Sequence, residues 1–252
     1  MGKDETGDFL ESSLESLHIR PYLFRGRSQS GQCVSLVSRD GERTMATYLG
    51  AALELEPSEL NGAIFEGFDC LYVEGYLVQN HDLIRSAVEL ARQRGLRVAL
   101  DLASFNVVEE HLDFLRDLTA EYVDIVFANE QEAAVFTGHR DPLRVLDELS
   151  SYCTLPVVKV GAEGAYLRHG DETIHTGVPT GVRCVDTTGA GDFYAAGFLT
   201  GMCENLPLRQ CGTLGALVAA RVIGFVGTTI PDATWRDIHA DAAAVRAGRY
   251  LL

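Results

Sequence analysis

The chain has 252 residues, of which 46% are hydrophobic, and this is enough apolar material for one sizeable α/β core. The formal net charge of −15 opposes nucleic-acid binding, because a phosphate backbone requires a basic surface. An uncharged apolar run long enough to span a membrane is absent, and the six cysteines show no Cys-x-x-Cys spacing. We therefore expect a cytoplasmic protein without a signal peptide that has reduced thiols and binds neither nucleic acid nor a membrane.

Helical and strand-like stretches alternate along the chain, which predicts a mostly parallel sheet covered by helices. The first element is an amphipathic helix, residues 4–17, with Phe9, Leu10, Leu14 and Leu17 on one side. Two strands, 32–37 and 43–48, follow and are joined by a tight turn at Arg39-Asp40-Gly41-Glu42. The remaining predicted strands are 70–73, 97–102, 123–128 and 156–160, the remaining helices are 81–94, 107–118, 129–137, 206–226 and 235–247, and a glycine-bearing hairpin spans 161–175. The pattern predicts one domain over residues 1–252.

The segment Asp186-Thr-Thr-Gly-Ala-Gly-Asp192 carries the most specific functional signal. An extended stretch, 181–185, enters it and a run rich in Ala, Leu and Phe leaves it, so the glycines fall where a helix begins. Glycine lets the first backbone N–H groups face outward, and the helix dipole adds partial positive charge there. The segment predicts an anion hole at Gly189, Ala190 and Gly191, with the Asp192 carboxylate placed to take a proton from an attacking hydroxyl. The alternative is a helix start at which the aspartates only act as caps.

This segment resembles the C-terminal signature of the ribokinase-like (PfkB) family of sugar and nucleoside kinases, in which its last Asp is the catalytic base. Further segments resemble the family in the same order, and 43–52 and 71–78 look most like adenosine-kinase-type members. The resemblance implies a ribokinase-like three-layer sandwich with a partial β lid at about residues 30–50. The further similar segments are a GxDxxG turn at Gly2–Gly7, the lid hairpin at 30–32 and 40–44, an Asn-x-x-Glu motif at Asn129–Glu132, and a nucleotide-bordering strand and turn at 158–165.

The resemblance also implies roles for single residues. Asn129 and Glu132 would organise Mg²⁺, and Glu74 and Asp101 would contact the acceptor. Asp186 and Thr188 would bind a monovalent cation such as K⁺ together with backbone carbonyls from 222–229. The residues that would contact ATP are Lys159, Gly161, Gly164, Thr188, Gly212 and Gly215. Most of these roles have a structural alternative. Asn129 and Glu132 can cap a helix, Asp186 can end a strand, Gly212 and Gly215 can belong to a packing face, and Glu74 can be a solvated carboxylate.

We therefore expect an ATP-dependent, Mg²⁺-requiring kinase that phosphorylates a primary hydroxymethyl group of a nucleoside or sugar, adenosine-like first. In the family, the first strands and an acceptor-binding Asp precede the GxDxxG turn, whereas here Met1 stands directly before it. The chain thus resembles an N-terminally truncated member, and the competing expectation is an inactive member with only a nucleotide-binding or interaction role. The resemblance also allows a homodimer through the lid, and it leaves the acceptor itself open.

Overall fold

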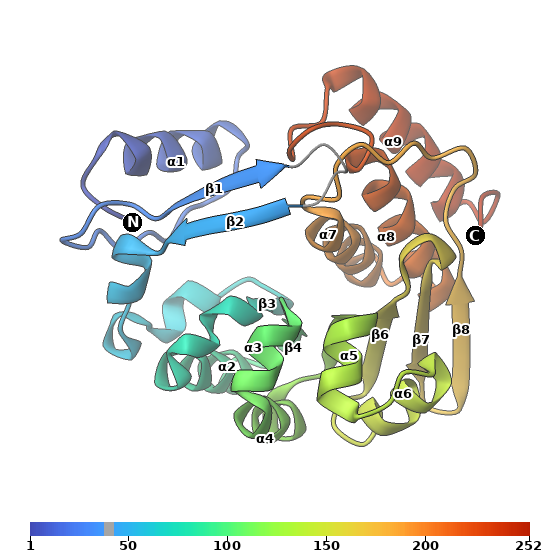
Figure 1. The fold of residues 1–252 in the computed structure, drawn as a ribbon, viewed down its shortest axis with the longest axis horizontal. Coiled ribbons are helices and arrows are strands. Elements are labelled where there is room, and N and C mark those ends of the chain that lie inside the picture. The colour runs from blue at the N-terminus through green and yellow to red at the C-terminus, as the bar shows by residue number, and fades with distance from the viewer. Residues whose placement is uncertain (38–42) are drawn as a thin grey trace. The chain divides into compact units, whose positions relative to one another are not determined.

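The computed structural model describes residues 1–37 and 43–252, and Figure 1 shows its elements. These residues fall into two compact units. Unit 1 comprises Met1–Phe68 and Gln79–Leu96, and unit 2 comprises Asp69–Val78 and Arg97–Leu252. The turn predicted at 39–42 lies outside the described residues. Every residue for which the sequence predicts a chemical role belongs to unit 2. A single kinase domain over the whole chain stays a prediction.

Unit 1 contains two longer helices and one hairpin, close to the predicted positions. These are α1 (Glu5–Ser16), β1 (Gln32–Val37), β2 (Arg43–Tyr48) and α2 (His81–Gln93), with short 3-10 helices η1 (Gly50–Glu54), η2 (Pro57–Glu59) and η3 (Gly62–Phe65). The two strands pair antiparallel, and Val34 lies opposite Ala46. The hairpin predicted from the spacing of turn residues is therefore present in the strands that the structure describes.

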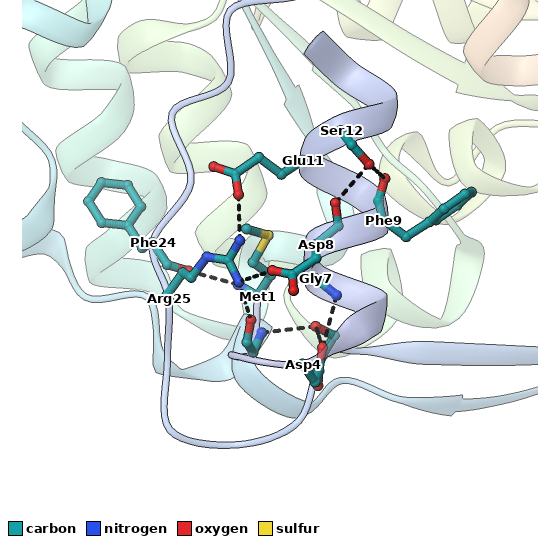
Figure 2. A network of polar contacts seen from close by, with 11 residues as sticks. Met1, Asp4, Gly7, Asp8, Phe9, Glu11, Ser12, Phe24 and Arg25 are labelled. Carbon is teal, nitrogen blue, oxygen red and sulfur yellow. Dashed lines mark hydrogen bonds and ion pairs between the residues drawn. The ribbon is translucent and has the colours of Figure 1, made fainter. Parts of the chain in front are cut away.

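The start of α1 is fixed by the carboxylate of Asp4 (Figure 2). One oxygen accepts hydrogen bonds from the Gly7 amide at 2.9 Å and the Ser30 hydroxyl at 2.7 Å, and the other accepts from the Ser30 amide at 2.7 Å. Arg25 forms ion pairs with Asp8 and Glu11 on the same helix (Figure 2). The segment that resembles a GxDxxG turn thus caps α1 and ties it to the residues that precede β1.

The apolar residues of α1 do not form the buried side that the sequence predicts. Phe9 is 71% exposed, Leu10 44% and Leu17 69%, while the buried residue of the helix is Gly7. The prediction of a helix at this place is correct, but periodicity alone did not show whether another element covers its apolar side.

Unit 2 is built on a six-stranded sheet of order β3-β4-β5-β6-β7-β8 (Figure 1). The first four strands are parallel, and the last two are antiparallel to their neighbours. The strands are β3 (Cys70–Glu74), β4 (Arg97–Asp101), β5 (Ile125–Asn129), β6 (Leu155–Lys159), β7 (Ala165–His169) and β8 (Glu172–Thr176). This arrangement confirms the mostly parallel α/β fold.

Helices cover both faces of this sheet. One face packs against α7 and α8, where Phe127 of β5 contacts Phe198 of α7 edge to face at 5.4 Å between ring centroids. The neighbouring residues Val126 and Val158 point to the other face and are equally buried. The helices of unit 2 are α3 (Phe105–Glu110), α4 (Leu112–Tyr122), α5 (Glu130–Thr137), α6 (Pro142–Leu149), α7 (Ala190–Cys203), α8 (Leu208–Val222) and α9 (Asp232–Arg246), with short 3-10 helices η4 (Gly75–Gln79) and η5 (Gly161–Glu163).

The elements of unit 2 differ from the prediction at three places. The single helix expected at 107–118 is two helices, because the Ser104 side chain caps α3 upstream of that range and the chain leaves helical geometry at His111. Helix α6 was not predicted, although Asp141 caps it and Pro142 occupies its first turn. The stretch 181–185 forms no strand.

Candidate active site

The carboxyl ends of β3, β4, β5 and β6 carry Glu74, Asp101, Asn129 and Lys159. Glu74 is the register partner of Asp101, and Asn129 is the register partner of Lys159. Asp101 lies beside Phe127, two residues before Asn129, so the alternation of side chains puts all four on the sheet face that α7 covers. Ligands of open α/β sheets are bound at this edge.

Helix α7 begins at Ala190, with Gly189 as its N-cap in the left-handed conformation, φ 77°. A Cβ on Gly189 would lie 2.9 Å from Cγ2 of Thr228, so both the backbone angle and the space require glycine. The Ala190 amide donates to the Thr187 carbonyl at 3.2 Å, which directs the candidate anion hole to the amides that follow it. Asp192 lies in the first turn of the helix.

The loop before α7 is held by the carboxylate of Asp186. One oxygen accepts hydrogen bonds from the amide and hydroxyl of Thr188 at 2.9 and 2.7 Å, and the other accepts from the Gly227 amide at 2.9 Å. The Val185 amide donates to the Ile223 carbonyl at 2.7 Å. The structure thus joins Asp186 to the 222–229 segment through the Gly227 amide and the Ile223 carbonyl, and the monovalent-cation role of Asp186 and Thr188 stays a prediction.

Lys159 and Asp101 form a nearly buried ion pair beside the start of α7. Lys159 Nζ lies 2.9 Å from Asp101 Oδ2, and the two side chains are 15% and 8% exposed. The same ammonium lies 3.2 Å from the position that a Cβ on Gly191 would take. A glycine at position 191 therefore lets the ammonium approach the first turn of α7.

Two carboxyl groups at this edge, those of Asp192 and Glu74, hold their protons more strongly than usual. Partial burial raises the pKa of Asp192, the negative charge of Asp101 raises it further, and Lys159 lowers it. Burial, followed by the charge of Asp101, raises the pKa of Glu74 to about 7. Raised carboxyl pKa values of this kind are typical of sites that transfer protons.

Glu74→Gln is expected to change how stability depends on pH. A carboxyl group whose pKa rises from 4.5 to about 7 on folding lowers the free energy of unfolding as pH increases across that interval. At pH above 7 the free energy of unfolding of the variant should exceed that of the parent by about 1 kcal/mol, a value that allows for the partial exposure of Glu74. This corresponds to a melting temperature roughly 2–4 °C higher. The difference in melting temperature should vanish near pH 4.5. Calorimetry across this range, with the exposed Glu172→Gln as control, measures it. A constant difference at all pH values would contradict the assignment.

Asn129 and Glu132 form a capping box at the start of α5. The Asn129 amide donates to Glu132 Oε2 at 2.7 Å, its side-chain nitrogen donates to Oε1 at 2.5 Å, and its Oδ1 accepts from the Glu132 amide at 3.0 Å. Burial raises the pKa of Glu132. The capping alternative is thus present. Within residues 1–37 and 43–252, His, Cys, Asp and Glu side chains form no group of three that could hold a metal ion, and the Mg²⁺ role stays a prediction.

The two glycines of the β6–β7 turn differ in their surroundings. Both have positive φ, 55° at Gly161 and 99° at Gly164. A Cβ on Gly164 would lie 2.0 Å from the Thr176 carbonyl oxygen, whereas Gly161 has open space around it. Packing against β8 therefore explains why position 164 requires glycine, whereas the space beside Gly161 leaves room for a ligand.

Gly212 and Gly215 lie in the buried contact between α7, α8 and the end of β8. A Cβ on Gly212 would lie 2.7 Å from Cγ2 of Thr176, and one on Gly215 would lie 2.8 Å from the Tyr194 carbonyl oxygen. These contacts support the packing alternative for both residues over a contact with nucleotide.

Gly215→Ala is expected to destabilise the protein by about 1–3 kcal/mol, the usual cost of an extra methyl in a closely packed contact. The KM for ATP should not change. Thermal unfolding and steady-state kinetics measure both effects. Gly177→Ala, with open space around residue 177, is the matched control. An increase in KM without loss of stability would restore the nucleotide role of Gly215.

Tyr72 is a residue of this edge that the sequence reading missed. It lies on β3 two residues before Glu74, and its ring is 6.3 Å from that of Phe127. The period-two alternation of a strand already places Tyr72 on the same face as Glu74. That signal was available in the sequence, but an aromatic residue in a strand is usually part of the core.

A parallel α/β sheet, a glycine-rich helix start that can bind an anion and a neighbouring carboxylate define a class of phosphate-transferring enzymes. The family model for pfkB family carbohydrate kinases matches residues 1–235, and the chain belongs to this family. It is therefore a phosphotransferase that acts on an alcohol group, a sugar or nucleoside kinase, and the family implies ATP as the donor.

Three similar proteins illustrate the relationship. A crystal structure of adenosine kinase from Sinorhizobium meliloti is 33% identical, with a TM-score of 0.87 over 98% of this chain and 76% of that one. A probable sugar kinase from Rhizobium etli is 29% identical, with a TM-score of 0.89 over 99% and 76%. An ATP-dependent 6-phosphofructokinase from Thermoanaerobacterium thermosaccharolyticum is 26% identical over 243 residues, 92% of this chain and 74% of its own.

Within residues 1–37 and 43–252, none of the helices has the length and apolar character that crossing a membrane requires.

Proposed function

We propose that this kinase transfers the γ-phosphate of ATP to the primary hydroxyl of a nucleoside, with adenosine as the first candidate. The observation that carries the chemistry is Asp192 in the first turn of α7, next to Gly191 and the Lys159 ammonium. The choice of a nucleoside is supported by the 33% identity to a protein named adenosine kinase over nearly the whole chain.

In this proposal Asp192 takes the proton of the acceptor hydroxyl as that oxygen attacks the phosphorus atom. Its raised pKa brings the carboxylate closer to the basicity that proton transfer requires. Lys159 and the amides of the first turn of α7 offset negative charge on the transferred group. ATP supplies the phosphoryl group, and ADP is the leaving group.

The charges at the sheet edge favour an uncharged acceptor. Glu74, Asp101 and Asp192 are three carboxyl groups, and the ammonium of Lys159 is already paired with Asp101. A phosphorylated acceptor would bring about two more negative charges close to these groups. We therefore place nucleosides and free sugars ahead of sugar phosphates, with Glu74 as the proposed acceptor contact.

The proposal includes Mg²⁺ and K⁺ as ions that bind together with ATP. Mg²⁺ commonly needs only one or two carboxylates because phosphates and water complete its shell. Glu132 is 3% exposed and engaged with Asn129, so it would act on the metal through water. Carbonyl oxygens of the 222–229 segment beside Asp186 would bind K⁺, which supplies positive charge near the anion hole.

The experiment is a panel of acceptors with ATP and Mg²⁺, in K⁺ and in Na⁺ at equal ionic strength. We expect kcat/KM to be highest for adenosine, lower for free sugars and lowest for fructose 6-phosphate, and to be higher in K⁺. Preference for a sugar phosphate would overturn the acceptor proposal. Equal rates in the two salts would overturn the cation site. No transfer to any acceptor would favour the competing hypothesis of an inactive nucleotide-binding member.

We also propose that two copies associate through the β1–β2 hairpin. Val34, Leu36 and Tyr48 share one face of this hairpin and are 58%, 61% and 53% exposed. Sedimentation of the parent and of Val34→Asp is the test, with a dimer expected only for the parent. A monomeric parent would refute the pairing.

A further inference from the structure

The hydroxyl of Tyr72 is buried and forms no hydrogen bond of normal geometry. In the described part of the chain, only one other buried side-chain oxygen or nitrogen shares this condition, the hydroxyl of Tyr194. A buried hydroxyl without a partner lowers stability, so its presence needs an explanation.

The surroundings of this hydroxyl are acidic. Burial first, then the negative charges of Asp101, Glu74 and Asp192, and last the proximity of the hydroxyl to the Asp101 carboxylate raise the pKa of Tyr72. The phenol therefore keeps its proton at any physiological pH, and it is a donor among carboxylates. Asp101 is the strongest of these charges acting on Tyr72.

The backbone holds Asp101 independently of Lys159. Its Oδ1 accepts the Ala103 amide at 3.1 Å, and its Oδ2 accepts Lys159 Nζ at 2.9 Å. Ala103 has φ 65°, which is strained for a residue with a side chain. A Cβ on Gly75 would lie 2.4 Å from the Asp101 carbonyl oxygen, so the start of η4, directly after β3, packs against this turn.

We propose that Tyr72 is a positioning residue, a reserve donor that hydrogen-bonds Asp101 when Lys159 turns from this carboxylate to the phosphoryl group. The inference rests on the proposed function, in which Lys159 contacts phosphate. Asp101 is 6% exposed, and a carboxylate this buried is costly once its partner has moved away. The proton of Tyr72 offsets that cost and so makes Lys159 available to ATP. Asp101 then serves Lys159 rather than the acceptor.

The test compares Tyr72→Phe with Tyr194→Phe, which removes the other buried, unpartnered hydroxyl from the core between α7 and α8. The readouts are the thermal midpoint without ligand, kcat/KM for ATP, and calorimetric binding of the β,γ-imido analogue of ATP with Mg²⁺. Both variants should melt at or above the temperature of the parent. Tyr72→Phe alone should lose roughly ten- to one-hundredfold in kcat/KM for ATP, the effect of one hydrogen bond to a charged group.

The loss should disappear in an Asp101→Asn background, because the carboxylate that Tyr72 serves is then neutral. A kcat/KM of Tyr72→Phe within about threefold of the parent would overturn the proposal, as would an equal loss in Tyr194→Phe or a loss that persists in the Asp101→Asn background. A lower thermal midpoint for Tyr72→Phe would show a structural role instead. If the parent bound the analogue but transferred no phosphate, the proposed function would fail. The positioning role would then be decided by analogue binding alone. Weaker binding by Tyr72→Phe would support that role, and binding equal to that of the parent would overturn it. A parent that neither binds nor transfers would overturn both.

Discussion

Asp192→Asn is expected to lower kcat by roughly 10²–10⁴-fold, the contribution of a positioned general base. The affinity for ATP should remain nearly unchanged, because the amides of α7 and Lys159, rather than this carboxylate, would contact the phosphates. Steady-state kinetics with adenosine and binding of the β,γ-imido analogue measure the two quantities separately.

The matched control for this substitution is Asp232→Asn. Asp232 is also in the first turn of a helix, α9, so it shares the favourable interaction with the helix dipole but has no place at the sheet edge. The control should keep the kcat of the parent. If Asp192→Asn stayed within about threefold of the parent, Asp192 would lose its role as the base.

Gly189→Ala is expected to reduce kcat by roughly 10²-fold, in the range found when one donor of an oxyanion hole is lost. The new methyl would meet Thr228 Cγ2 at 2.9 Å in a backbone conformation with φ 77°. The first turn of α7 must shift to relieve this contact, and the amides that face the phosphate shift with it. The measurement is single-turnover transfer to adenosine together with the thermal midpoint.

Gly170→Ala separates the two effects of that substitution. Residue 170 also has positive φ, 58°, but open space surrounds it in the β7–β8 turn. It carries the same conformational strain of roughly 1–2 kcal/mol without moving α7. Similar activity losses in the two variants would mean that lower stability, rather than a displaced anion hole, explains the Gly189 result.

The strands, and the glycine-rich start of α7 on which the candidate site is built, were predictable from sequence because local signals determine them. The buried strand predicted at 123–128, which the structure has at Ile125–Asn129, reads as a short apolar run, and the glycines around Ala190 mark a helix start. The structure adds a separate reason for each glycine. Position 189 needs a left-handed backbone, and position 191 needs room for the Lys159 ammonium.

The contacts that join distant residues were not predictable in the same way. Lys159 and Asp101 are 58 positions apart, and only the strand order brings their side chains together. Gly212 and Gly215 read as candidates for nucleotide binding, because a sequence does not show which side of a helix packs on its neighbour. The unpartnered hydroxyl of Tyr72 is likewise visible only when all surrounding atoms are placed.

Transfer of label from γ-labelled ATP to adenosine tests the central claim most directly. The parent should form labelled adenosine monophosphate, with the phosphate on the primary hydroxyl, and Asp192→Asn should form almost none while it still binds the β,γ-imido analogue. Label released only as inorganic phosphate, or the same yield of labelled product from the parent and from Asp192→Asn, would contradict a nucleoside kinase that uses Asp192 as its base.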